Sequence, residues 1–442
     1  MKDLFKNPRF IKLFAAGVTS QLGNTIGNMA LAFYLLDRFS TQPFYATLAE
    51  LMYSAPTLLV FFLVGVLADR MDRKRICAYS DWIRAGLTVG LLGAVTAGWM
   101  PLVFLVLFIR SAVGKFFYPA QSALMQSILK QEHYTTAAGM NQMVFSLFML
   151  FGTGLGALAY HYIGIQGAVL VDGLGFLVSG VLIQSMRIEE KDRLPNGRTR
   201  WKDIGLPLIV EDFRKGIGYI WTNKLLLALI TGFFMLGFIN GAFAVLPMFT
   251  MKYKLAPDDY QRFSSLFSIF LGIGVFPGSL AGAWLIRKWG FIRVMAGGLL
   301  AAGVVGAGMV FATNVWVYLA ATVGVGLTIG PLNVAIGGWM PRIIDSGIRG
   351  RVNAWTDPIM MASQSAALGI IAVLFPQYMK LEAAYVAVGI CMVLTAALYL
   401  WKLPGLAASQ GGWNAGREIP AGAVPESSGA PLAGASSLEE RL

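Results

Sequence analysis

The sequence is poor in charged residues, cysteine and histidine. Only 13% of its 442 residues are charged, and it contains 2 cysteines and 2 histidines. Cys77 and Cys391 lie far apart in the chain, and His133 and His161 are also isolated. A disulfide framework or a metal site needs several thiols or ligands at short, regular spacing, so neither is predicted here.

The chain also lacks the motifs of nucleotide binding and covalent catalysis. No stretch has the Gly-x-x-x-x-Gly-Lys-Ser/Thr pattern whose backbone amides cradle phosphates, so ATP is not expected to be the energy source carried by this chain. We therefore predict no catalytic residues, no cofactor and no metal, and we expect the protein not to be an enzyme.

Apolar residues dominate instead. They make up 56% of the chain, and the mean hydropathy of +0.64 is outside the range of soluble globular domains. A helix needs about 20 apolar residues to cross a bilayer, and the sequence contains about twelve such runs. Backbone groups in lipid must be hydrogen-bonded internally, which favours helices. The predicted fold is an all-α polytopic membrane protein.

The predicted spans form two sets. The first set covers residues 10–36, 45–67, 76–99, 101–122, 137–163 and 167–186, and the second covers 225–251, 263–286, 291–312, 315–340, 352–376 and 383–401. Turns between neighbouring spans are short, so consecutive helices should form antiparallel hairpins. Two corresponding halves are typical of secondary transporters built from internal repeats. We therefore predict six-helix bundles at 1–186 and 225–402.

Two segments lie outside the bundles. The linker at 187–224 sets apolar residues among charges, which favours an amphipathic helix on the membrane surface, although an ordinary linker fits nearly as well. The tail at 403–442 is rich in Gly, Ala, Ser and Pro and is predicted to be disordered and cytoplasmic.

Positive charge predicts the orientation. With the N-terminus inside, most of the 35 Lys and Arg residues fall on the cytoplasmic side. The outer loops hold only Arg38, Lys252, Lys254, Arg262 and Lys380. Because basic residues in short loops stay on the cytoplasmic side, both termini are predicted to be cytoplasmic, in the inner or cytoplasmic membrane. The net charge of +12 is spread over separate loops, so nucleic acid is not expected as a partner.

A dense charged loop separates the second and third spans. Its sequence, GVLADRMDRKR at 65–75, places six charges between Asp69 and Arg75. Positive charge that fixes topology is the simplest explanation. The pattern also resembles the loop between helices 2 and 3 of the major facilitator superfamily, with Asp72 where that family usually has Gly. This resemblance implies a conformational switch formed by Gly65, Asp69, Arg70 and Arg73.

Two further motifs resemble the macrolide-efflux and siderophore-exporter branch of that superfamily. They are Arg110 with Gly114, and the stretch Asp172-Gly-Leu-Gly-Phe176. The resemblance covers about residues 1–402 and implies a monomeric, proton-coupled antiporter that exports amphipathic small molecules by alternating access. A lipid or lysolipid flippase, with Arg110 and Lys115 at a phosphate, is the first alternative. A metal or organic-ion facilitator and a non-transporting scaffold are the others.

A polar stripe marks the first span. Gln21, Asn24, Thr25 and Asn28 follow the spacing of one helix face, which predicts either a cavity lining or a helix–helix contact. We take the cavity lining as the working hypothesis, because first helices line the cavity in the family that the chain resembles. The candidate substrate-binding residues are Gln21, Asn24, Asn28, Arg110, Phe234, Asn240 and Asn333.

Arg110 lies about nine residues inside the fourth span, where an unpaired charge is costly. It should therefore pair with a carboxylate or an anionic ligand, and Asp37, Glu50 and Asp172 are the possible partners. Glu50, Asp172 and Arg110 are the candidates for proton coupling. Asp81 and Arg84, three residues apart in the third span, are interpreted as a structural pair that orients this helix against the charged loop.

Overall fold

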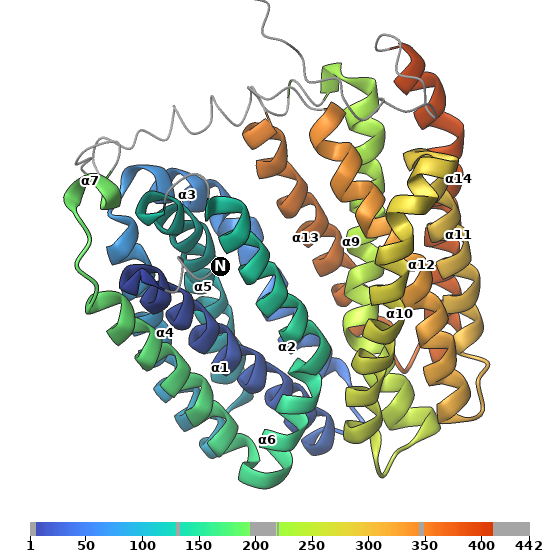
Figure 1. Cartoon of the computed structure of the whole chain (residues 1–442). Helices are drawn as coiled ribbons and strands as arrows, with labels where there is room; N and C mark the ends of the chain where they lie inside the picture. The colour runs from blue at the N-terminus through green and yellow to red at the C-terminus, as the bar shows by residue number, and fades with distance from the viewer. Residues whose placement is uncertain (1–5, 130–132, 195–217, 219–220, 344–348, 410–442) are drawn as a thin grey trace, which may run out of the picture.

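The computed structural model describes residues 6–129, 133–194, 218, 221–343 and 349–409. Within these ranges the chain is helical almost throughout and contains no β-strand, which confirms the all-α prediction. Figure 1 shows two groups of helices that follow the order of the chain, one from each half. In the described part, eight helices are long and apolar enough to cross a membrane.

The N-terminal half contains the first six expected spans. It consists of α1 (Pro8–Arg38), α2 (Phe44–Ser54), α3 (Pro56–Arg70), α4 (Arg73–Ala97), α5 (Met100–Ile128) and α6 (Tyr134–Gln184). Together α2 and α3 form the second span, which is interrupted before Pro56 because proline has no N–H to donate. The fifth and sixth spans are both in α6 and turn at Gly164, whose φ of 67° suits a residue without Cβ.

The C-terminal half contains the other six spans. It consists of α9 (Lys224–Thr250), the π-helix η4 (Met251–Leu255), α10 (Tyr260–Trp289), α11 (Phe291–Met309), α12 (Val315–Ile343), α13 (Arg349–Leu374) and α14 (Leu381–Ser409). Because α14 continues to Ser409, the predicted start of the tail at residue 403 is wrong. The rest of the tail lies outside the described residues. So does almost all of the helix predicted in the linker, where a short helix, α7 (Glu190–Arg193), is described.

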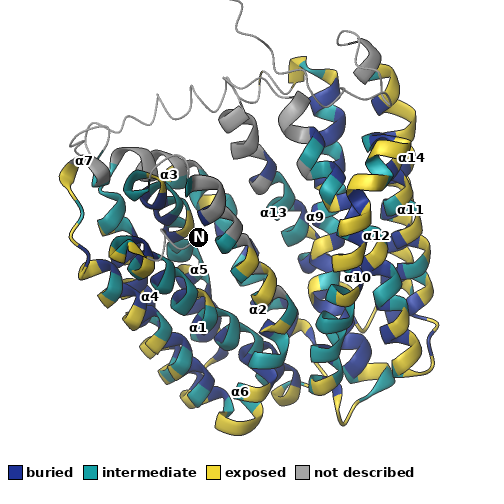
Figure 2. Ribbon diagram, in the orientation of Figure 1, coloured by how far each residue is buried: buried dark blue, intermediate teal, exposed yellow. Residues whose placement is uncertain are grey.

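Many large apolar side chains face outward. Leu59, Val89, Phe276, Val304 and Trp401 are each more than half exposed. Figure 2 shows exposed positions along the outer sides of helices such as α4, α10 and α14. Such surfaces are unfavourable in water but suit contact with lipid tails, as expected for membrane-spanning helices.

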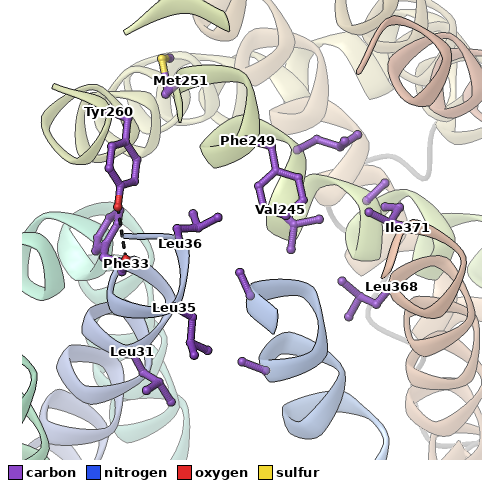
Figure 3. Packing of buried hydrophobic residues seen from close by; sticks show 14 of the residues in the cluster. Leu31, Phe33, Leu35, Leu36, Val245, Phe249, Met251, Tyr260, Leu368 and Ile371 are labelled. Atoms are coloured by element: carbon purple, nitrogen blue, oxygen red, sulfur yellow. Dashed lines mark hydrogen bonds between the residues drawn. The ribbon is translucent and has the colours of Figure 1, made fainter. Parts of the chain in front are cut away.

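Among the described residues, the two halves share a hydrophobic core at one end of the molecule. We call this end, where α1 finishes, the Asp37 end, and the opposite end, where α4 begins, the Lys74 end. At the Asp37 end, Phe33 and Leu36 of α1 belong to the same buried cluster as Val245, Phe249 and Ile371 of the other half (Figure 3). Side-chain packing therefore joins the halves there.

At the Lys74 end the described buried residues form two separate clusters. One cluster lies in the N-terminal half and includes Phe10, Cys77 and Phe117. The other lies in the C-terminal half and includes Met295 and Tyr399. The halves are thus packed together at the Asp37 end, and each half has its own core at the Lys74 end.

Candidate functional site

A buried ion pair joins α5 to the second span of α6. Arg110 is 2% exposed and Asp172 is 0% exposed, and Nη1 of the arginine contacts Oδ2 of the carboxylate. The same Nη1 lies 3.4 Å from the Thr88 hydroxyl, and Nη2 donates to the amide oxygen of Asn28 at 2.8 Å. Of the three carboxylates considered as partners of Arg110, the structure selects Asp172.

Close packing of α1 against α6 brings Asn28 to this pair. A Cβ atom at Gly27 would lie 2.8 Å from the Cβ of Asp172, and one at Gly23 would lie 3.0 Å from the Asp172 carbonyl oxygen. A small residue is needed for this approach, because a larger side chain would push the two helices apart. Two glycines about one helical turn apart thus place the α1 amides beside the buried charges.

Asp81 and Arg84 form a second buried pair on α4. Nη1 of Arg84 lies 3.3 Å from Oδ1 of Asp81, which confirms the pairing expected from their spacing. The Ser20 hydroxyl donates to Asp81 at 3.1 Å, and Nη2 of Arg84 donates to the amide oxygen of Asn24 at 3.2 Å. These described partners belong to α1. The interpretation that the pair orients α4 against the charged loop stays a prediction, because the loop side chains at 65–70 lie outside the described residues.

An aromatic ring lies beside both arginines. The centroid of the buried Phe176 ring is 3.8 Å from Cζ of Arg84 and 5.8 Å from Cζ of Arg110. The electron-rich face of an aromatic ring attracts a nearby cation. A Cβ atom at Gly114 would lie 3.4 Å from Nε of Arg84, so this glycine borders the second arginine.

These side chains form one network, which we call the charge cluster. Its members are Asn24, Asn28, Asp81, Arg84, Arg110 and Asp172. Two arginines and two carboxylates make it neutral when both carboxylates are ionised, which reduces the cost of burying charge in a membrane protein. Among the described residues, Oδ2 of Asp81 and Oδ1 of Asp172 have no hydrogen-bond partner. Each carboxylate therefore has one oxygen that no described residue engages in a hydrogen bond.

Tyr53 of α2 lies near both the charge cluster and Glu50, and its hydroxyl has no hydrogen-bond partner among the described residues. The buried hydroxyl of Tyr53 is within electrostatic range of Arg110, Glu50 and Asp172. Glu50 itself is half-buried and makes no ion pair or hydrogen bond with any residue that the structure describes. The sequence analysis missed Tyr53, because one tyrosine in an apolar run shows no distinguishing pattern.

Four candidate residues lie outside the cluster. Gln21 is exposed on α1, one turn before Asn24. Phe234 on α9 is 43% exposed, and Asn240 on α9 and Asn333 on α12 are also exposed. None of the three amides forms a hydrogen bond within the described part of the chain. Their role in binding therefore stays a prediction.

Only part of the charged loop is described. The helix α3 runs through Arg70, but the side chains of the predicted switch residues Gly65, Asp69 and Arg70 lie outside the described residues. Arg73 donates to the carbonyl oxygen of Ala123 on α5 at 3.3 Å, within its own half. The conformational switch thus stays a prediction.

Asp72, the residue that departs from the family pattern, begins α4. Its carboxylate accepts a hydrogen bond from the backbone N–H of Arg75 at 3.1 Å, which caps the helix. It also lies 3.2 Å from Nη1 of Arg193 on α7. A glycine could do neither, so Asp72 ties the start of the linker to the charged loop.

Asp37 lies at the junction of the two halves and not beside Arg110. Its carboxylate accepts hydrogen bonds from Nζ of Lys252 at 2.9 Å, the Tyr260 hydroxyl at 2.8 Å and Nε2 of Gln261 at 3.2 Å. All three donors belong to the C-terminal half. We call Asp37 and these three residues the Asp37 junction.

Aromatic contacts reinforce the Asp37 junction. The Tyr260 hydroxyl also lies 3.3 Å from the Phe33 carbonyl oxygen, as Figure 3 shows, and the two rings meet edge to face. The Tyr253 hydroxyl donates to the Ser40 carbonyl oxygen at 2.9 Å. Polar contacts and the shared core therefore hold the two halves together at the same end.

The fold and the charge cluster define a class of protein. Two halves of six helices, with apolar outer surfaces and a neutral network of buried charges in one half, are typical of polytopic secondary transporters. The chain belongs to the Major Facilitator Superfamily, whose family model matches residues 13–367. It is therefore a transporter of small molecules and a polytopic protein of the cell membrane.

Relatives of known name support the exporter branch. An uncharacterized MFS-type transporter, YkuC of Bacillus subtilis, is 51% identical over 91% of this chain and 94% of its own length. Macrolide efflux protein A of Streptococcus pyogenes is 27% identical over 50% of this chain and 53% of its own length. The putative bacilysin exporter BacE of Bacillus subtilis is 29% identical over 54% and 56%. The predicted resemblance to the macrolide-efflux branch is thus confirmed.

Solved structures show the same fold. The chain superposes on a peptide transporter POT in complex with sulfate with a TM-score of 0.71 at 14% identity, covering 90% of this chain and 94% of that one. A bacterial homologue of the iron transporter ferroportin, in an inward-facing state, gives a TM-score of 0.69 at 15% identity, covering 88% and 97%. At such low identity these matches show the fold alone.

Proposed function

We propose that this protein is a proton-coupled exporter of amphipathic small molecules, acting as a monomer by alternating access. The observation that carries the proposal is the charge cluster around Arg110 and Asp172. Burying four ionisable side chains in membrane-spanning helices costs free energy, and such residues usually belong to substrate or proton pathways. The cluster is also neutral only while both carboxylates are ionised, so binding one proton changes its charge.

The arrangement of the two halves supports alternating access. A transporter of this kind closes one end of a central site while it opens the other. The Asp37 junction and the shared core join the halves at one end, and at the other end the described buried residues form two separate cores. With the orientation given by positive charge, the Asp37 end faces outward and the Lys74 end and both termini face the cytoplasm.

Protons are the proposed coupling ion. In this proposal Asp172 takes up a proton at its unpaired oxygen, which weakens its ion pair with Arg110. Glu50 and Tyr53 lie on the α2 side of the arginine and provide a route toward it. The predicted switch of Gly65, Asp69, Arg70 and Arg73 lies at the Lys74 end, and in this proposal it acts in the opposite state, in which that end is closed.

The relatives suggest the class of substrate. Two of them are named for macrolide efflux and for bacilysin export, so an organic small molecule is the proposed substrate. A flippase for lysolipids remains the second candidate, since Arg110 is a possible phosphate ligand, and a facilitator for an ion is the third. In this structure Arg110 is already neutralised by Asp172, which favours the exporter.

The test uses everted membrane vesicles that contain the protein and a radiolabelled macrolide. We expect accumulation when the vesicle interior is made acidic, loss of accumulation after a protonophore, and little accumulation by Asp172→Asn. Accumulation that does not depend on the pH gradient would favour a facilitator. Movement of a fluorescent lysolipid without movement of the macrolide would favour the flippase.

A further inference from the structure

Two asparagines of α1 have their amide groups oriented by the two buried arginines. Nη2 of Arg84 donates to Oδ1 of Asn24 at 3.2 Å, and Nη2 of Arg110 donates to Oδ1 of Asn28 at 2.8 Å. A guanidinium has donors and no acceptor, so each asparagine must present its oxygen to the arginine. The NH2 group of each side chain then points away from its arginine.

These NH2 groups have no partner in the part of the chain that the structure describes. Neither Nδ2 atom forms a hydrogen bond with any residue that the structure describes. The two asparagines are half-buried, whereas the arginines behind them are buried. An amide donor without a partner in a membrane-spanning helix costs free energy, so a ligand or water that accepts from it is favoured.

Other residues of α1 pack against both spans of α6. Gly23 and Gly27 pack against the second span of α6, and Thr25 packs against Gly152 in its first span. Asn24 and Asn28 are four residues apart, so their donors are separated by about 6 Å along the helix axis.

The charge behind these donors is already neutralised. Arg84 is paired with Asp81, and Arg110 is paired with Asp172. The asparagine pair therefore offers hydrogen-bond donors without a net positive charge. Such a surface binds oxygen acceptors of uncharged groups and gives no particular advantage to a cation or an anion.

We propose that Asn24 and Asn28 form a donor pair that binds two acceptor oxygens, such as carbonyl, hydroxyl or ether oxygens, about 6 Å apart on an uncharged part of the substrate. The arginines act as positioning residues that fix the amide orientation. This inference rests on the proposed transport function and deepens it, because it names the chemical group that the substrate must carry. The donor pair selects oxygen-rich neutral ligands over cations that lack acceptors.

The substitution Asn28→Asp tests the donor pair directly. A carboxylate keeps an acceptor for Arg110, so folding is retained, but it removes both N–H donors and gives the charge cluster a net negative charge. Chloramphenicol, which is neutral and rich in acceptor oxygens, and tetraphenylphosphonium, a cation without them, are the two probes. The dissociation constants of both are measured on the purified full chain.

We expect Asn28→Asp to weaken chloramphenicol binding by about tenfold, which is the loss of one or two hydrogen bonds, and to strengthen tetraphenylphosphonium binding. Asn24→Asp is the second variant and should shift the two affinities in the same directions. The matched control is Asn141→Asp on α6, whose amide faces the sulfur of Met125 and which should leave the ratio of the two affinities unchanged.

The outcomes separate this inference from the proposed function. If the wild-type protein binds chloramphenicol but both variants change the two affinities by the same factor, or not at all, the donor pair is overturned and the transporter proposal stands. If the wild-type protein binds neither probe and moves no macrolide in the vesicle test, both proposals are overturned.

Discussion

The two buried arginines are the residues on which the functional account depends. Each one is held by a carboxylate, by an amide oxygen of α1 and by the ring of Phe176. A planar guanidinium can satisfy several acceptors at once in fixed directions, whereas a lysine ammonium is a point charge on a flexible chain. The identity of the cation therefore matters as much as its charge.

Arg110→Lys tests this point. The variant keeps the charge but cannot reach Asp172, Thr88 and Asn28 from one rigid group. We expect the rate of pH-driven macrolide accumulation in vesicles to fall by more than about tenfold, because losing hydrogen bonds to a charged group costs about 1.5–3 kcal/mol. The amount of protein in the membrane should stay within about twofold of the wild type.

The matched control is Arg38→Lys at the end of α1, where the arginine is exposed and donates to the Tyr34 hydroxyl. This variant should transport at the wild-type rate. Equal rates for Arg110→Lys and Arg38→Lys would show that the buried geometry has no role in transport.

At the residue scale, the sequence predicts some features of the charge cluster but not all of them. The depth of Arg110 in an apolar run predicts that it needs a partner, and this prediction is correct. The choice between Asp37, Glu50 and Asp172 could not be made, because it depends on how each helix is rotated about its axis. That rotation is set by packing, here by glycines of α1 against α6, which a single sequence does not reveal.

At the scale of the element, α1 is the helix that organises the N-terminal half. It packs closely along the second span of α6 and supplies both asparagines of the charge cluster. Its polar stripe was recognised from spacing alone, because a period of 3.6 residues is a local property of the sequence. The break before Pro56 and the turn at Gly164 also follow from single residues, although their geometry needed the structure.

Gly27→Ala tests the close packing of α1. The added Cβ would lie 2.8 Å from the Cβ of Asp172, closer than such atoms approach in proteins, so the helices must move apart. Overpacking of this kind costs about 1–3 kcal/mol. We expect a lower thermal transition in detergent and a loss of transport.

Gly86→Ala on α4 is the control for Gly27→Ala, because apart from the adjoining backbone of α4 no described atom lies within 4 Å of the position that a methyl group would take at Gly86. Alanine also favours a helix more than glycine does, so this variant should be as stable as the wild type or slightly more stable. A thermal transition in Gly27→Ala equal to that in Gly86→Ala would contradict the packing described here.

At the scale of the whole molecule, the two halves meet mainly at the Asp37 end. Their division into two sets of spans was predictable from apolar runs and from the polar linker. Which end of the molecule is closed could not be predicted, because alternate arrangements of the same halves differ by only a few kcal/mol in free energy. The carboxylate of Asp37 accepts hydrogen bonds from three side chains of the other half. From the sequence, Asp37 is predicted only as a possible partner of Arg110.

Asp37→Asn is expected to favour opening of the Asp37 end. The amide cannot form the ion pair with Lys252, and because Asp37 is partly exposed this loss is worth about 1 kcal/mol, or about fivefold in the ratio of the two states. Distances between spin labels at Thr41 and Asp258, in a background without cysteine, should show a larger population of long distances.

The matched control for Asp37→Asn is Glu382→Gln. This substitution removes an ion pair with Lys254 at the same end, but both partners belong to the C-terminal half. It should leave the distances between Thr41 and Asp258 unchanged. The same distance distribution in both variants would show that the Asp37 junction does not control this end.

Spin-label distances at both ends of the same protein test the central claim of proton-driven alternating access most directly. One pair of labels, at Thr41 and Asp258, reports on the Asp37 end, and a second pair, at Arg75 and Lys288, reports on the Lys74 end. Between pH 8 and pH 5 we predict opposite changes, one distance becoming longer as the other becomes shorter, and no such change in Asp172→Asn. Distances that stay constant, or that change at one end without the other, would contradict the account.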